Sequence, residues 1–288
     1  MTSLKTWREL AVAALVAGSF CSAAVAADPG NKEQVRSEMQ QLPWQHGPAD
    51  AAVGQKASLH VPERGGLLPE SSGSRFLELT GNLPETGNTD LVNGNWWATF
   101  AFNESGYIKD DEKLDAAELL ESMRKGQDEQ NAERRKRGMD ELFIDGWAVA
   151  PHYDPATKYL EWGTKLHSSR GGPAVVNYSM RLLSRRGYET VVLVTDAGTL
   201  DHDVQELRGI LKGFSFNAGE GYAEFRPGDH VAEFGLGALV LGGAAAAAVK
   251  AGWFKGLLAA LAAGWKLVAA SVVAGGAGLK RLFGRKSA

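Results

Sequence analysis

From Gly235 to the last residue, the chain contains no aspartate or glutamate, and this feature constrains its fold more than any other. Runs of alanine, leucine, valine and glycine fill the segment, and its charges are all basic: Lys250, Lys255, Lys266, Lys280, Arg281, Arg285 and Lys286. An apolar segment that carries only basic charges is typical of membrane proteins. We therefore expect a C-terminal membrane anchor at residues 234–283, preceded by one folded domain.

The apolar stretch Phe234–Leu279 is longer than a single span requires. As a helix it would measure about 69 Å at roughly 1.5 Å per residue, whereas the hydrocarbon core is about 30 Å thick. We favour one span at about 234–254, then a basic amphipathic helix on the cytoplasmic surface and a basic cytoplasmic tail at 284–288. The residues of this helix that face the membrane surface are Lys255, Lys266, Lys280 and Arg281. The alternative is a hairpin of two spans, which would bury Lys266 and return the C-terminus to the outside.

The N-terminus has the features of a cleaved export signal. Lys5 and Arg8 precede the apolar run Leu10–Phe20, which is too short to span a bilayer. The small residues around Ala26 suit signal peptidase, so residues 1–26 are the expected signal peptide. A lipoprotein is disfavoured because Phe20 precedes Cys21, where a small side chain is needed. As Cys21 is the single cysteine, the mature chain should hold no disulfide and no cysteine-ligated metal.

Residues 27–230 are predicted to form one extracytoplasmic α+β domain. The chain is 44% hydrophobic and 23% charged, which suits a globular domain, and a formal net charge of −3 argues against nucleic-acid binding. Side chains alternate along Asn95–Phe102, Leu160–His167 and Val175–Leu182, Val191–Val194 is continuously apolar, and Phe143–Ala150 is a further predicted strand. Short turns join these segments, so we expect an antiparallel β-meander sheet with flanking helices. This element order resembles the α/β/α sandwiches of the PsbP and Mog1 type.

The helices and shorter strands are assigned from local signals. Asp115 and Glu118 start a helix that ends at Gly138, and Thr199–Leu211 carries apolar residues at helical spacing. A further helix is expected at Asn31–Leu42. Three shorter expectations are a strand at Arg75–Thr80, a hairpin return at Tyr107–Lys109 and the end of the Phe143 strand at Pro151. The basic cluster Arg134–Arg137 is interpreted as a solvated helix end, with an anion or lipid-headgroup contact as the alternative.

Several strings resemble those of a bacterial family, DUF2167, described as uncharacterised membrane-anchored proteins. They are Gly94–Phe100, Gly106–Glu112, Gly146–Val149, Pro151–Asp154, Leu160–Trp162, Val176–Tyr178, Arg181–Gly187 and Gly213–Asn217. The resemblance extends over most of residues 59–284. It implies a bacterial envelope protein with a membrane anchor, and it supplies no activity, cofactor or catalytic residue. Together with the export signal and the anchor, this predicts a protein of the bacterial inner (plasma) membrane whose soluble domain lies in the periplasm or outside.

No phosphate-binding loop, zinc-protease motif or nucleophile elbow is present, so we predict no cofactor and no metal. His152 and Asp154 are the weak catalytic candidates, because a histidine oriented by a carboxylate can act as a general base. The same pair also fits a turn before Pro155. Asp201-His202-Asp203 could bind a metal, but it stands at a helix start, where carboxylates normally satisfy the helix dipole and free backbone N–H groups, so capping is favoured.

Two groups of residues are weak ligand-binding candidates. Trp96 and Trp97 point to opposite faces of one strand, and an exposed indole could form a binding platform, although core packing of both is favoured. Arg181, Arg185 and Arg186 gather near one turn, where a solvated turn is favoured over an anion site.

Two classes of function remain. The first is a non-enzymatic binding or envelope-maintenance module, with the lipid bilayer and an envelope protein as partners and with self-association through Gly252-x-x-x-Gly256. The second is a periplasmic hydrolase-like enzyme that uses His152 and Asp154. The absence of a catalytic signature favours the first class.

The anchor topology can be tested with a cysteine appended after Ala288. Loss of Cys21 with the signal peptide would leave this thiol as the only one in the mature chain. With a single span it lies in the cytoplasm, so an impermeant thiol reagent should label it only after lysis. Labelling of intact cells before lysis would mean that the hairpin is correct.

Overall fold

The computed structural model describes residues 29–85, 87–94 and 96–242. The folded unit ends at Leu241. The predicted signal peptide, most of the predicted anchor and its basic residues Lys255, Lys266, Lys280 and Arg281 lie outside the described ranges. Within those ranges, no helix combines the length and the apolar character that a bilayer crossing demands.

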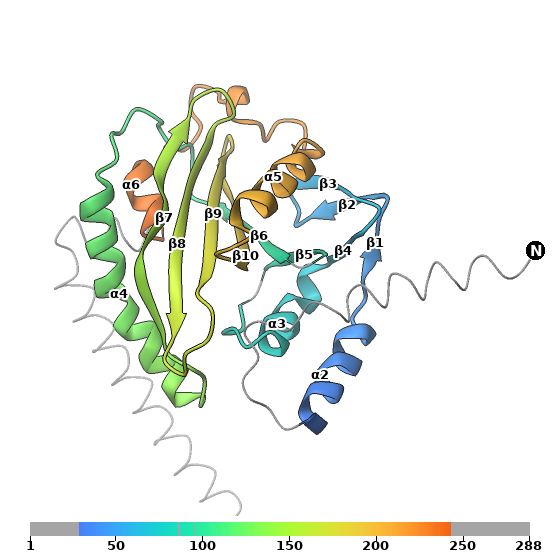
Figure 1. Ribbon diagram of the computed structural model, residues 1–288. Coiled ribbons are helices and arrows are strands. Elements are labelled where there is room, and N and C mark those ends of the chain that lie inside the picture. Colours follow the sequence, from blue (N-terminus) through green and yellow to red (C-terminus); the bar gives the residue numbers. More distant parts are fainter. Residues whose placement is uncertain (1–28, 86, 95, 243–288) are drawn as a thin grey trace, which may run out of the picture. The chain divides into compact units, whose positions relative to one another are not determined.

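The domain is built on one antiparallel sheet of eight strands (Figure 1). In spatial order these are β1 (Gln45–His46), β4 (Gly65–Leu68), β5 (Thr89–Asn93), β6 (Trp96–Glu104), β10 (Gly187–Asp196), β9 (Val175–Leu183), β8 (Tyr159–Ser168) and β7 (Leu142–Asp154). Strands β7 to β10 are consecutive neighbours, which confirms the predicted meander. The other neighbour of β10 is β6, and in this pair Phe100 lies opposite Val191.

Five helices and a second sheet surround the main sheet. The helices are α2 (Pro29–Gln41), α3 (Glu70–Leu79), α4 (Ala116–Lys136), α5 (Leu200–Leu211) and α6 (Leu236–Val240), and a 3₁₀ turn, η1, spans Tyr222–Glu224. The second sheet has the order β11 (Phe214–Phe216), β3 (Ala57–Val61) and β2 (Ala49–Val53). The α+β class and the flanking helices are therefore confirmed.

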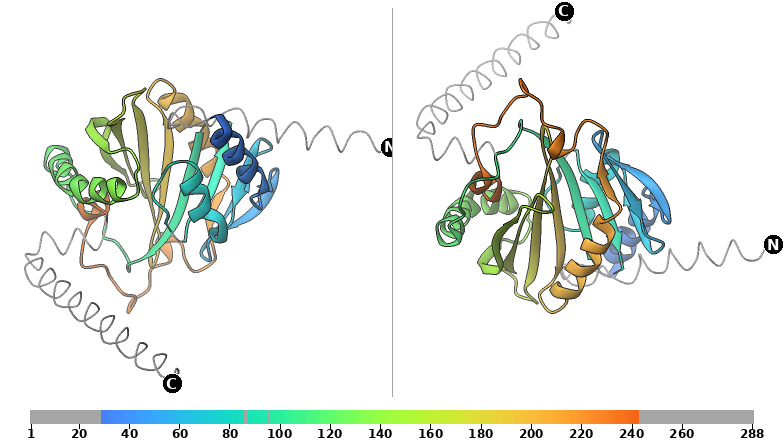
Figure 2. Two further views of the ribbon diagram at one scale, coloured as in Figure 1. Left: turned by 90° about the horizontal axis from the view of Figure 1, so that it is seen from below. Right: turned by 90° about the horizontal axis from the view of Figure 1, so that it is seen from above.

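Both faces of the main sheet are covered, as the two views in Figure 2 show. On one face, α5 and the second sheet enclose a core with Phe100, Met180 and Leu193. On the other face, α4 and α6 cover Leu160 and Trp162 of the meander. Helices α2 and α3 cover that same face at the β4–β5 end, where Leu68, Phe76 and Val92 are buried. Side chains of either parity are thus buried along much of β8 and β9, whereas one parity of β6 and β10 stays partly exposed.

Helix α4 lies along β7, the strand at one edge of the sheet, and its polar side chains bond to the backbone of that strand. Asn131 donates to the carbonyl of Leu142 at 2.8 Å and accepts from its N–H at 2.9 Å. Gln127 accepts from the N–H of Ile144 at 3.0 Å, and Arg124 donates to the carbonyls of Ile144 and Asp145. These side chains occupy the pairing positions of an exposed edge, which would otherwise attract another strand.

The end of α4 is not simply solvated, contrary to the prediction for Arg134–Arg137. Arg134 is buried and donates to the backbone carbonyls of Asp140 and Gly81. Arg135 pairs with Glu141, while Arg137 pairs with Glu133 on its own helix. Arg134 and Arg135 therefore hold the turn into β7, while Lys136 and Arg137 are exposed as predicted.

Helix α6 belongs to the folded domain. Its residues Leu236, Leu239 and Val240 are buried in the same core as Trp162. They form the beginning of the stretch 234–254 assigned to a membrane span, and the remainder of that stretch lies outside the described residues.

Three local predictions were wrong. Arg75–Thr80 is part of α3 because Gly73, Phe76 and Leu77 share one buried helical face. Tyr107–Lys109 does not return as a hairpin, since both edges of β6 are already paired; Tyr107 forms an isolated parallel bridge to Val231. Strand β7 continues past Pro151 to Asp154, because at a sheet edge the missing N–H removes no ladder bond and the register shifts there.

The edge interaction of α4 predicts a large effect of Asn131→Ala. The substitution removes two hydrogen bonds and leaves a partly buried N–H and carbonyl of Leu142 unpaired, so the free energy of unfolding should fall by about 2–4 kcal/mol. Urea unfolding followed by tryptophan fluorescence measures the change. Gln130→Ala, at an exposed neighbouring position, is the matched control and should change stability by less than about 0.5 kcal/mol. Equal effects of the two substitutions would contradict the account.

Candidate functional site

Asp154, one of the two catalytic candidates, closes a turn. Its carboxylate accepts from the N–H of Ala156 and from the hydroxyl of Thr157, both at 2.9 Å. These bonds lower its pKa, led by the bond from Ala156. The carboxylate of Asp154 is therefore engaged in the β7–β8 turn, and no hydrogen bond joins it to His152.

His152 lies opposite Glu161 in the β7–β8 pair, and its ring is about half exposed. Its Nε2 atom is 3.8 Å from Oε2 of Glu161, too long for a hydrogen bond. Its Nδ1 atom lies 3.3 Å from the carbonyl oxygen of Ala150. The carboxylate that faces His152 is thus Glu161.

Glu161 is the centre of a buried polar network. The residue is 4% exposed and accepts hydrogen bonds from the hydroxyl of Tyr178 and from the guanidinium of Arg208. Arg208 also donates to the Tyr178 oxygen at 3.1 Å. Burial and the bond to Glu161 raise the pKa of Tyr178. A buried carboxylate needs such donors to offset the loss of hydration. Here Tyr178 and Arg208 donate to the Glu161 carboxylate on the side that faces α5.

The three arginine candidates do not form one site. Arg185 makes a bidentate pair with Asp229, with both N–O distances 2.7 Å. That pair lowers the pKa of Asp229 to about 2. Arg186 pairs with Glu220, which also accepts from Lys56 at 3.0 Å. Both arginines therefore fix the segment that follows β11 to the main sheet.

Arg181 is separate from these pairs and is 8% exposed. Its guanidinium lies 4.7 Å from the ring centre of Trp162 and 5.8 Å from that of Tyr188. Among the described residues, its one hydrogen bond runs from Nη1 to the carbonyl of Met180. Its Nε atom is buried without an acceptor.

The two tryptophan candidates lie on opposite faces of β6, as their spacing predicts. Trp96 is 2% exposed, and its indole N–H donates to Glu206 of α5 at 2.8 Å. Trp97 is half-buried and makes an edge contact with Phe76 at 5.2 Å between ring centres. Neither indole offers a free stacking surface.

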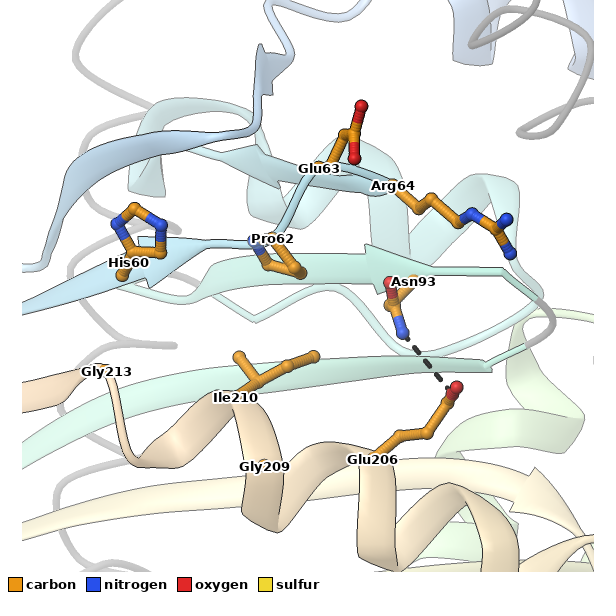
Figure 3. Close-up of a pocket in the computed structure, with 9 residues that line it drawn as sticks. All are labelled: His60, Pro62, Glu63, Arg64, Asn93, Glu206, Gly209, Ile210 and Gly213. Atoms are coloured by element: carbon orange, nitrogen blue, oxygen red, sulfur yellow. Dashed lines mark hydrogen bonds between the residues drawn. The ribbon is translucent and has the colours of Figure 1, made fainter.

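A depression with a cavity volume of about 500 Å³ lies between α5 and the strands β3 and β5 (Figure 3). Its lining residues are His60, Pro62, Glu63, Arg64, Asn93, Glu206, Gly209, Ile210 and Gly213. The Glu206 side chain rises from α5 toward Asn93, which donates to it at 3.4 Å (Figure 3). The indole N–H of Trp96 donates to the same oxygen, Oε2 of Glu206, at 2.8 Å. The depression combines an oriented carboxylate with an apolar contact surface at Ile210.

Three groups beside this depression approach metal-ligand spacing. Ligand atoms of His202, Asp203 and Glu206 all lie within 4.8 Å of one another. However, Asp203 already accepts from the hydroxyls of Thr195 and Thr199. Glu206 is likewise held by Trp96. Asp201 and Asp203 lie in the first turn of α5, where the helix dipole favours acidic residues, but no side chain of the described residues caps a backbone N–H group of this helix, contrary to the prediction.

The sequence did not reveal Glu161, Tyr178, Arg208 or Glu206 as parts of polar clusters. Glu161 lies on the alternate face of a strand whose other face is apolar, a pattern that normally marks solvent exposure. Its burial depends on α5, which follows far along the chain. The one local signal was the position of Glu161, a charged residue beside Trp162 among mostly apolar residues of the strand.

Comparisons with known proteins give a family and two distant folds. The family model described as "Protein of unknown function (DUF2167)" matches residues 45–276. No curated protein sequence matches the chain. Cyanobacterial PsbP (CyanoP) from Synechocystis sp. PCC 6803 is 10% identical, with a TM-score of 0.35, over 60% of this chain and 98% of that one. The Saccharomyces cerevisiae Ran-binding protein Mog1p is 12% identical, with a TM-score of 0.32, over 62% and 99%.

The Glu161 network predicts opposite behaviour of two neighbouring residues. Tyr178→Phe removes a donor to a buried carboxylate and should lower the free energy of unfolding by about 1–3 kcal/mol. His152→Ala removes a half-exposed ring that makes no hydrogen bond to Glu161 and should change it by less than about 0.5 kcal/mol. Denaturant unfolding of both variants measures the difference. The reverse order would show that His152, not Tyr178, stabilises Glu161.

Proposed function

The chain belongs to the DUF2167 family, and we propose that it is a non-enzymatic binding module of the bacterial envelope. In this proposal residues 1–26 direct export, the folded domain lies in the periplasm and the C-terminal segment anchors it in the inner membrane. Because α6 is buried in the domain, the span begins beyond Leu241 and not at Phe234. The anchor would raise the effective concentration of the domain at the membrane surface.

One observation carries the non-enzymatic part of the proposal: the carboxylates nearest to His152 are already engaged. Asp154 is bonded within its turn, and Glu161 accepts from Tyr178 and Arg208. A general base needs an oriented partner and a reachable proton. His152 has a 3.3 Å contact to a backbone carbonyl and no hydrogen bond to either carboxylate. This geometry supports a structural role for the polar network.

The ligand site in this proposal is the depression between α5 and β3. It is a concave surface in which Glu206, fixed by Trp96 and Asn93, faces the apolar side chain of Ile210. Ligand sites commonly combine an apolar surface with a few oriented polar groups. Arg64, which also lines it, adds a positive charge.

The second candidate function is a hydrolase-like enzyme that uses His152. One distance favours it, the 3.8 Å between His152 Nε2 and Glu161 Oε2, because catalytic hydrogen bonds are often long before substrate binds. In that case Glu161 would replace Asp154 as the carboxylate that orients the histidine.

Replacement of the chromosomal gene separates the two functions. Under a condition that impairs a deletion strain, His152→Ala should support normal growth, because the ring serves no reaction. Ile210→Trp, which fills the depression, should reproduce the growth defect of the deletion. Lys212→Trp is the matched control, since it adds the same side chain at an exposed position on the same helix end, and it should behave as wild type. Immunoblots confirm equal protein levels.

Two results would contradict the proposal. If His152→Ala reproduced the deletion defect at normal protein level, the hydrolase would be the better account. If Ile210→Trp grew normally, the depression would not be the ligand site.

A further inference from the structure

The domain buries several charged side chains, and most of them have partners. Those with partners are Arg134, Glu161, Asp203 and Glu220, and those that retain unpartnered atoms are Asp90, Glu189 and Arg181. The unpartnered atoms are both carboxylate oxygens of Asp90, one of Glu189 and the Nε of Arg181. The cost of burial differs between the two carboxyl groups and the guanidinium.

Buried carboxyls can avoid the cost of a buried charge by binding a proton. Burial raises the pKa of Asp90 to about 7 and that of Glu189 to about 8, so both can be neutral near physiological pH. A guanidinium has no such route. Burial lowers the pKa of Arg181, but only to about 10, so the group stays charged. Its charge therefore needs compensation from other groups.

The protein supplies only part of that compensation. Trp162 and Tyr188 flank the guanidinium, and the carbonyl of Met180 accepts one N–H. In the described part of the chain, no carboxylate comes within ion-pair distance of Arg181. Cation–π contacts replace less than the hydration that a buried cation loses. The group most suited to complete the site is an anion.

The surroundings of Arg181 provide an approach from one side. Leu160 lies opposite it on β8 and is fully buried, whereas Thr190 lies opposite it on β10 and is partly exposed. Asn103 of β6 donates to the Thr190 oxygen at 3.0 Å, which leaves the Thr190 hydroxyl hydrogen available to a ligand. Ala101, opposite Thr190, is also partly exposed. This small surface of β6 and β10 presents the Thr190 hydroxyl at the position paired with Arg181, whereas the Asn103 amide group donates to Thr190 and to the carbonyl of Ala101.

We propose that Arg181 and Thr190 form a binding site for a carboxylate, on the sheet face opposite the depression beside α5. The guanidinium supplies a planar fork that fits a carboxylate, and Thr190 supplies a further donor. One buried cation balances one negative charge, so a monocarboxylate fits where a doubly charged phosphate would leave an excess. Apolar Ala101 favours a carboxylate on a short apolar chain. The source is either a free organic acid or the C-terminal end of a peptide. The site does not depend on the proposed function of the depression.

The test is thermal unfolding of the mature protein in detergent, with sodium propionate titrated against sodium chloride at constant ionic strength. The melting temperature of wild type should rise saturably, by roughly 5–10 °C at about 100-fold excess over Kd. Arg181→Met should melt at an equal or higher temperature without ligand, because an apolar side chain replaces an unpaired buried charge, and propionate should not raise it. Arg226→Met, which removes an exposed arginine, should respond as wild type.

Two further arms identify the ligand. Phosphate at the same ionic strength should give no saturable rise. Acetyl-alanyl-alanine, compared with its C-terminal amide, distinguishes the sources: a larger rise than with propionate indicates a peptide end, and a smaller one a free acid. Arg181→Lys keeps the charge but loses the fork, and it should weaken propionate binding at least tenfold. If Arg181→Met does not fold, Arg181→Lys alone tests whether the guanidinium binds propionate.

Three results would overturn the site. They are a wild-type melting temperature that propionate does not change, an equal rise in the Arg181 variants, and an equal rise with phosphate. Either of the first two would mean that Arg181 binds no carboxylate, and the third would mean that the site takes anions in general and is not a carboxylate site.

Discussion

The central sheet is covered on both faces, and the loss of water from both faces is the constraint on which the rest of the structure depends. An apolar side chain on a middle strand gains from this burial, whereas a charged one loses hydration and needs a partner. Glu161 accordingly binds Tyr178 and Arg208 across three elements. At the sheet edge, the backbone N–H and carbonyl groups of β7 also need hydrogen-bond partners, and Asn131 of α4 provides them.

This constraint also explains why the polar residues that the sequence suggested as site candidates do not assemble into a catalytic site. Asp154 completes a turn, Glu161 stabilises the junction of the meander with α5, and Arg185 and Arg186 hold the chain after β11. Each polar group near His152 contributes to folding. The surfaces that remain for function are the depression beside α5 and the environment of Arg181, which lie on opposite faces of the sheet.

The meander could be predicted because its signals are local. Alternation along β8 and β9 and the short turns between them determine strands and order, and Asp115 caps α4 as its sequence indicates. The sandwich of two sheets could not be predicted, because β3 pairs with β11 from a distant part of the sequence. The same limit applied to α3: Arg75–Thr80 alone resembles a strand, and only Gly73 packed against Asn88 and Asp90 shows the helical face.

For the candidate sites, too, only features that depend on nearby sequence could be predicted. The sequence identified His152, Arg181 and Trp96 as unusual residues, but their partners come from separate elements. Arg181 seemed to belong with Arg185 and Arg186 because all three are close in sequence. On the strand, however, Arg181 projects into an aromatic core while the other two reach acidic residues beyond β11. Distance along the chain could not show which arginine lacked an acidic partner.

The central claim is that Arg181 is a buried charge whose compensation comes from a bound carboxylate. The most direct measurement is an NMR titration of the protein labelled with ¹⁵N-arginine, in which the Nε–H signal of Arg181 is assigned by its absence in Arg181→Lys. Addition of propionate at constant ionic strength should shift this signal saturably while the Nε–H signal of Arg185, held by Asp229, stays in place. An unchanged Arg181 signal, or equal shifts of both signals, would contradict the account.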